Sequence, residues 1–127
     1  MFVTRFGVSL TTDSASAATS YTSEPVNGRV LQIRYVPDGS TPLDTSADVD
    51  ITGEVTGVVI ANLVNIGTSA FTRAIRQPVH APNGAIGLYA AAGATVQDHV
   101  VLAGERIQVA VASGGATKLG TFHIWVG

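Results

Sequence analysis

Apolar side chains alternate with polar ones over much of this chain, and this period of two is the feature that most constrains the fold. The clearest stretch is one in which Leu31, Ile33 and Tyr35 share one parity while Gln32 and Arg34 take the other. Further stretches of this kind cover residues 2–10, 47–52, 106–111 and 121–126. Because only a β-strand places successive side chains on opposite faces, the pattern predicts several half-buried strands.

Turn-forming residues separate these stretches at short intervals. Asn27-Gly28 tolerates the positive φ of a tight turn, and Ser113-Gly114-Gly115 is typical of a hairpin connection. The sequence thus predicts about eight to ten short strands, spaced by roughly 10–14 residues, in a single β-domain that spans residues 1–127. A β-sandwich, a jelly roll and a β-barrel all fit this spacing, and the fold class is all-β in each case.

Three segments are less clearly predicted. Residues 58–64 are almost continuously apolar, which indicates a strand covered on both faces, with a short helix as the alternative. Residues 71–75 form a weaker strand candidate. Residues 86–92 contain three consecutive alanines that favour a helix, yet Gly87 and Gly93 interrupt it, so this segment is left open.

Charged side chains are scarce. They make up 13% of the residues, against about 25% in an average soluble domain. One interpretation is a stable β-domain with a plain exterior, and the other is an exterior that neighbouring subunits cover, which we favour. With a net charge of -2 and Lys118 as the one lysine, the sequence carries no basic footprint for nucleic acid, so no direct nucleic-acid partner is expected.

The basic residues are almost all arginines, which suit protein interfaces because a planar guanidinium forms bidentate pairs and stacks on other groups. Ordinary surface charge is the alternative for each of them. Trp125 lies on the parity opposite Phe122 and Ile124, so it is predicted either to anchor an interface or to lie in a core covered on both sides. The predicted interface residues are Arg5, Arg29, Arg34, Arg73, Arg76 and Trp125.

No residue pattern predicts an enzyme, a metal site or a cofactor site. His80, His99 and His123 lie outside any His-Glu-x-x-His spacing, and no Gly-x-Ser-x-Gly elbow occurs. Cysteine is absent, so no thiolate is available as a nucleophile or a ligand. An acidic cluster suggests a Ca²⁺ site or, preferably, the solvent face of a strand. Its members are Asp38, Asp44, Asp48 and Asp50.

The sequence also predicts no membrane partner. No stretch approaches the roughly 18 apolar residues that a transmembrane helix needs. Residues 1–6 lack the basic segment and the long apolar run of a signal peptide.

Beyond these patterns, the chain resembles small proteins encoded near the major capsid proteins of tailed bacteriophages. The stretches that carry the resemblance are FGVSLTTD (6–13), VNGRVLQIRY (26–35), DITGEVTG (50–57), LYAA (88–91) and GTFHIWVG (120–127). They look like head decoration, or cement, proteins, and the resemblance covers the whole chain through structural motifs rather than catalytic ones.

The resemblance implies a β-rich virion protein made in the host cytoplasm and bound to the outside of an icosahedral head. Its partners would be the major capsid protein and copies of itself, often as a homotrimer, with no cofactor. Many modest contacts repeated over a shell can stabilise it without one tight site. The alternatives are a phage tail or neck subunit and a receptor- or carbohydrate-binding β-module, although 6% aromatic residues argues against a sugar platform.

Overall fold

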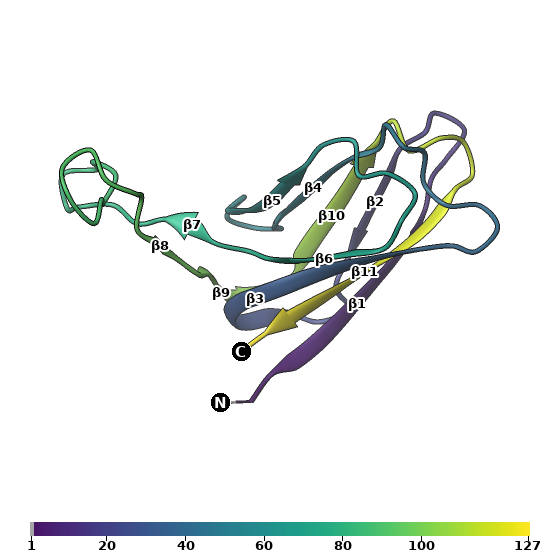
Figure 1. Cartoon of the computed structure of the whole chain (residues 1–127). Coiled ribbons are helices and arrows are strands. Elements are labelled where there is room, and N and C mark those ends of the chain that lie inside the picture. Colours follow the sequence, from purple (N-terminus) through teal and green to yellow (C-terminus); the bar gives the residue numbers. More distant parts are fainter. Residues whose placement is uncertain (1) are drawn as a thin grey trace.

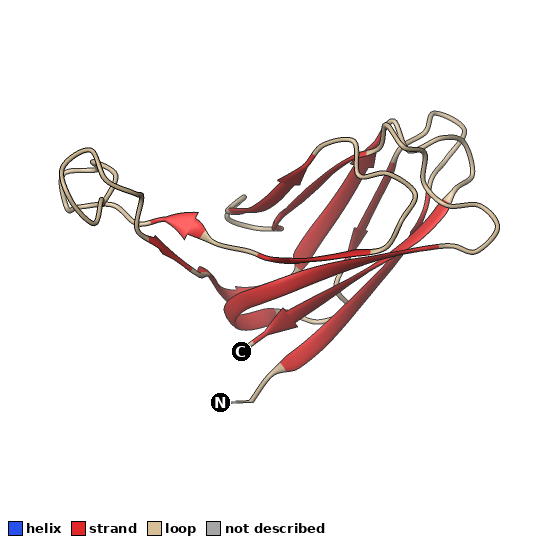
Figure 2. Ribbon diagram, in the orientation of Figure 1, coloured by secondary structure: helices blue, strands red, loops and turns tan. Residues whose placement is uncertain are grey.

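Eleven strands form in residues 2–127, which are the residues that the computed structural model describes, and Figure 2 shows strands and loops only. No helix in these residues could cross a membrane. The strands are β1 (Thr4–Thr11), β2 (Ala18–Tyr21), β3 (Val26–Pro37), β4 (Asp48–Gly53), β5 (Val59–Leu63), β6 (Phe71–Ala74), β7 (Gln77–Pro78), β8 (Gln97–Asp98), β9 (Val100–Glu105), β10 (Ile107–Ala112) and β11 (Leu119–Val126).

Two antiparallel sheets face each other and enclose the core (Figure 1). The first has the order β1-β11-β3-β6, with β9 also paired to β3, and the second has the order β2-β10-β4-β5. The two short strands β7 and β8 pair only with each other. The predicted all-β fold class is therefore confirmed, and of the architectures left open the chain adopts a sandwich.

The core consists of the side chains that the alternation places inward. Ile33 and Tyr35 of β3 and Phe122 of β11 are fully buried, and they face Ile51 and Ile107 from the second sheet. The Tyr35 ring lies 5.0 Å from the Phe122 ring, centroid to centroid. Burial raises the pKa of the Tyr35 phenol because its ionised form would be poorly solvated there. The period of two thus identifies the buried side chains of β11 and of the second half of β3. Leu31, which the sequence places inward with Ile33 and Tyr35, is only half-buried, because β3 bulges there and Val30 takes the inward position instead.

Strands β6 and β9 together occupy one edge of β3. Residues 71–74 pair with residues 35–32 of β3, and residues 100–105 pair with residues 30–26. Between them, the Ile75 N–H donates to the Leu31 carbonyl at 3.4 Å. The pairing therefore continues along β3 from Ile75 to Val100 almost without a gap, although residues 76–99 separate them in the chain. Residues 76–99 are thus an insertion between two segments that together form one edge strand beside β3.

Strand β5 differs from its prediction. Residues 59–63 of the predicted segment 58–64 form a strand, as expected, but the prediction that both faces of this strand are covered is wrong, because Val59 is 49% exposed whereas Ile60 and Leu63 are buried. The physical reason is that the fold has only two layers, so each sheet has one face against the other sheet and one face toward solvent. The number of layers cannot be deduced from the composition of one strand, since the same apolar residues suit a strand covered on both faces.

Two further details depart from the sequence pattern. Residues 86–92 form no helix and lie in the insertion between β6 and β9. Phe2 shares the parity of Val8 and Leu10 but is 96% exposed, because β1 begins only at Thr4. A side chain with the right parity is buried only where the opposite sheet extends over it.

The Glu105 carboxylate holds the turn that joins β4 to β5. Glu105 is nearly buried, its Oε1 accepts the backbone N–H groups of Val55 and Thr56 at 3.0 Å, and its Oε2 accepts the Thr56 hydroxyl at 2.8 Å. A Cβ atom at Gly53 would collide with this carboxylate. The hydrogen bonds from Thr56, backbone first, keep the pKa of Glu105 below its ordinary value of 4.5.

This lowered pKa predicts an acid-sensitive contribution to stability. A carboxyl whose folded-state pKa is depressed stabilises the fold above its ordinary value, and the contribution disappears as pH falls through the folded-state pKa. We expect Glu105→Gln to lower Tm by about 5 °C at pH 7, with the difference from the parent narrowing below pH 4.5. Thermal unfolding across this range tests it, with the exposed Glu24→Gln as the matched control. An equal loss at every pH would contradict the charge-based explanation.

Candidate functional site

Residues 76–99 form an arm that projects from the edge of the sandwich (Figure 1). At its base β7 pairs with β8, with Gln77 opposite Asp98 and Pro78 opposite Gln97. The hydrophobic core contains Ile75 and Val100 at the two ends of the arm and no residue between them. The arm is thus held by its root alone and adds nothing to the core.

The arm ends in a small hydrogen-bonded tip. A segment around Gly87 inserts between the two legs, where the Gly87 N–H donates to the Val79 carbonyl at 2.8 Å and the Val96 N–H donates to the Gly87 carbonyl at 3.0 Å. A Cβ atom at Gly87 would lie 3.0 Å from the Val79 Cγ2, so glycine fits this close approach best. The tip therefore has a defined backbone, although it has no buried apolar cluster of its own.

Apolar side chains at the tip face solvent. Tyr89 is 76% exposed, Ile86 52% and Leu88 44%, and residues 81–97 contain no charged side chain. A two-stranded hairpin is marginally stable by itself in water, and clustered exposed apolar side chains are typical of interaction sites. The tip of the arm is accordingly the candidate functional site.

The root of the arm is fixed by a histidine. Nη1 of Arg76 donates to Nε2 of His99 at 2.6 Å, while Nδ1 of His99 donates to the Val30 carbonyl at 3.2 Å. A guanidinium only donates and a carbonyl only accepts, so these two contacts place the accepting ring nitrogen toward Arg76 and the donating one toward Val30. Both ends of the arm are thereby tied to each other and to β3.

Three of the six predicted interface residues share the outer face of the first sheet. Arg5 lies directly opposite Trp125 across β1 and β11, and Arg34 lies opposite His123 across β3 and β11. Trp125 is half-buried, with its ring 6.2 Å from that of His123, and Arg34 donates to the Thr72 hydroxyl at 2.8 Å. Residues opposite each other in a sheet project to the same side, so these side chains form one surface.

The other three predicted residues lie elsewhere. The backbone of Arg29 pairs with that of Gly127, and Arg76 lies at the root of the arm. Arg73 has the parity of the buried Ile33, and its guanidinium carbon lies 4.4 Å from the centre of the Phe71 ring. A charged residue on the inward parity of an edge strand discourages unwanted strand pairing. The six residues therefore do not form a single patch, and their interface role stays a prediction.

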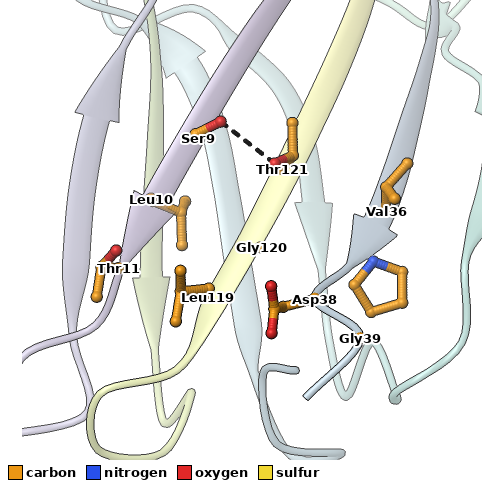
Figure 3. Close-up of a pocket in the computed structure, with 10 residues that line it drawn as sticks. Ser9, Leu10, Thr11, Val36, Asp38, Gly39, Leu119, Gly120 and Thr121 are labelled. Atoms are coloured by element: carbon orange, nitrogen blue, oxygen red, sulfur yellow. Dashed lines mark hydrogen bonds between the residues drawn. The ribbon is translucent and has the colours of Figure 1, made fainter. Parts of the chain in front are cut away.

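A hollow of about 360 Å³ lies at the opposite end of the first sheet, between β1, β11 and the end of β3 (Figure 3). Asp38 lines it, but its Oδ2 accepts the N–H groups of Thr41 at 2.9 Å and Ser40 at 3.0 Å, and these bonds lower the pKa of Asp38. The Ser9 and Thr121 hydroxyls lie 3.2 Å apart. No histidine lines this hollow, so its hydroxyls have no imidazole to activate them.

Metal-ligand groupings are likewise lacking in residues 2–127, where no three His, Asp or Glu side chains come together. Of the acidic cluster, Asp48 and Asp50 lie on β4, where Asp50 is exposed and Asp48 accepts the Asn65 N–H at 3.0 Å. This places both on the solvent side of a strand, which is the preferred interpretation of the sequence.

Comparisons with known proteins add little to this geometry. No family model and no curated protein sequence matches the chain. One solved structure, the crystal structure of FLHE, aligns with a TM-score of 0.41 and 11% sequence identity, over 99% of this chain and 98% of that chain. A likeness this weak says nothing about what the chain does.

Sequence reasoning missed the tip of the arm. Ile86, Leu88 and Tyr89 are not among the predicted interface residues, although Leu88 and Tyr89 belong to a stretch that carries the phage resemblance. One signal was present, since residues 81–97 are a long uncharged stretch that shows neither strand alternation nor an uninterrupted helical pattern. No periodic pattern in this segment predicts its conformation, because its backbone is set by the hydrogen bonds within the tip and not by burial.

Proposed function

We propose that this chain is a structural virion protein that decorates the outside of a tailed-phage capsid, as a homotrimer, and stabilises the shell. The observation that carries the proposal is the arm, which extends from the sandwich, has no charged side chain in residues 81–97 and exposes Ile86, Leu88 and Tyr89. An arm that adds nothing to its own core gains stability only by reaching a neighbour. Reach of this kind suits a protein that links subunits of a larger assembly.

The body of the protein fits the same role. Its outer sheet face presents Arg5, Arg34 and Trp125, which offer guanidinium and indole groups to a partner. Few other charges interrupt the surface, so covering it costs little desolvation. The capsid as partner and the trimeric state come from the resemblance to decoration proteins described above.

Co-sedimentation with phage heads tests the proposal. The ligand is the expanded, undecorated head of a tailed phage, and light scattering of the purified chain gives its oligomeric state. We expect saturable binding to expanded heads and a solution mass three times the 13.0 kDa of one chain. Bound protein should also raise the temperature at which the heads rupture, because many repeated contacts act together.

Two controls define the outcomes. Arg34→Ala alters the predicted capsid face without touching the core, and should weaken head binding while the trimer persists. Glu24→Ala, an exposed change in a loop, should leave both unchanged. A monomer without affinity for heads contradicts the proposal, and binding to tails or necks instead of heads selects the tail-subunit alternative.

A further inference from the structure

A second surface of the molecule matches the arm. A groove of about 440 Å³ runs between β5, the last strand of its sheet, and residues 74–78, which lead from the end of β6 in the other sheet into β7. Its walls include Ile60, Leu63 and Ile75, which belong to the core, and Asn62, which is exposed. The groove is thus a place where the core of the sandwich reaches the surface along an open edge.

The groove is nearly uncharged. Arg76 is its one charged lining residue, and that guanidinium is already bound to His99 at the root of the arm. Strand β5 pairs with β4 on one side only, so its other edge is open to a further strand. Val59 and the flanking Val64 are exposed beside it, at 49% and 69%. An uncharged, partly extended segment is the ligand that such a surface fits.

The arm has the composition and the length for this groove. Its residues 81–97 are uncharged, and each leg of about ten residues can reach roughly 30 Å, whereas a five-residue strand such as β5 spans roughly 17 Å. The arm cannot fill the groove of its own molecule, because it leaves from Gln77 and Pro78 at the end of that groove and extends away from the body (Figure 1).

We infer that the tip of the arm of one copy docks in the β5–β6 groove of a second copy. Each chain carries both an arm and a groove. In a closed ring of copies, every groove therefore receives the arm of a neighbouring copy, and no arm or groove is left unpaired. An incoming arm would also run beside the arm of the acceptor, since Gln77 and Pro78 line the groove. This inference rests on the self-association in the proposed function and not on capsid binding.

Disulfide trapping tests the exchange cleanly because the chain has no cysteine. The double variant Asn62→Cys/Tyr89→Cys places one thiol in the groove and one at the tip, both at exposed positions. Mild oxidation should link tip to groove between copies and produce covalent oligomers, at least about tenfold more than the control because docking raises the effective concentration of the thiols. The control, Ser14→Cys/Tyr89→Cys, moves the first thiol to the exposed loop between β1 and β2.

Each result decides the question. Selective linkage between the groove thiol of one chain and the tip thiol of another, identified by mass spectrometry of the joined peptides, supports the exchange. Equal linkage in the control, a disulfide within one chain, or an unlinked trimer overturns it. Because no heads are present, failure here with normal head binding would reject the arm exchange and leave the decoration role intact. Normal linkage without head binding would support the arm exchange and reject the decoration role.

Discussion

Deletion of residues 76–99, with Ile75 joined directly to Val100, is expected to give a folded body that no longer self-associates. The reason lies in the register of β3. Ile75 donates to the Leu31 carbonyl, and Val100 pairs with the next residue, Val30, so a single peptide bond can join the two ends. The deletion would convert β6 and β9 into one uninterrupted edge strand.

Stability should change little. No residue from 76 to 99 belongs to the core, and a shorter connection costs less loop-closure entropy. We expect Tm to shift by no more than about 3 °C. Light scattering should nonetheless give a monomer, because the arm and its docking contacts are gone. Circular dichroism and thermal unfolding establish that the body is folded.

A point variant at the tip tests whether the loss of self-association is due to the tip or to the deletion of the whole arm. Leu88→Asp places a charge at the exposed tip and should also yield monomers, whereas Ala116→Asp, in the exposed loop between β10 and β11, should not. Assembly that persists in both the deletion and Leu88→Asp would show that the subunits associate through another surface. The outer face that carries Arg5, Arg34 and Trp125 would then be the first to examine.

The long strands could be predicted from the sequence because alternation is a local property. Ile33, Tyr35 and Phe122 are inward by parity alone, and the structure buries all three completely. The same parity brings Arg5 and Trp125 to one face once β1 and β11 pair. Polar–apolar alternation therefore identifies the buried side of a strand, except where a bulge shifts the parity, as between Val30 and Leu31 of β3. It does not identify which strand lies next to it.

What the sequence could not reveal depends on distant parts of the chain. Strand β5 lies at an edge because nothing else pairs with it, and its own residues 58–64 carry no sign of that. The collinear arrangement of β6 and β9 on β3 joins segments that the whole arm separates. The arm contributes no residue to the core. The polar–apolar alternation of the sandwich strands reflects burial, and beyond its root the arm is not subject to that constraint.

Phe122→Ala is expected to be the most damaging single substitution in the sandwich. Phe122 is fully buried on β11, the strand between β1 and β3, and its ring lies 5.0 Å from that of Tyr35. Removing a buried phenylalanine ring typically costs about 3–5 kcal/mol through lost burial and the cavity left behind. Domains of this size are stable by about 5–15 kcal/mol, so the change removes a large part of the total.

Urea unfolding measures this loss against a neighbour on the same strand. Thr121 lies beside Phe122 but on the outer parity, so Thr121→Ala should cost well under about 1 kcal/mol. The midpoint for Phe122→Ala should fall strongly while the slope of the transition stays the same, because the surface exposed on unfolding hardly changes. Comparable costs for the two variants would mean that Phe122 does not lie between the sheets, and the inward parity of β11 would have to be reversed.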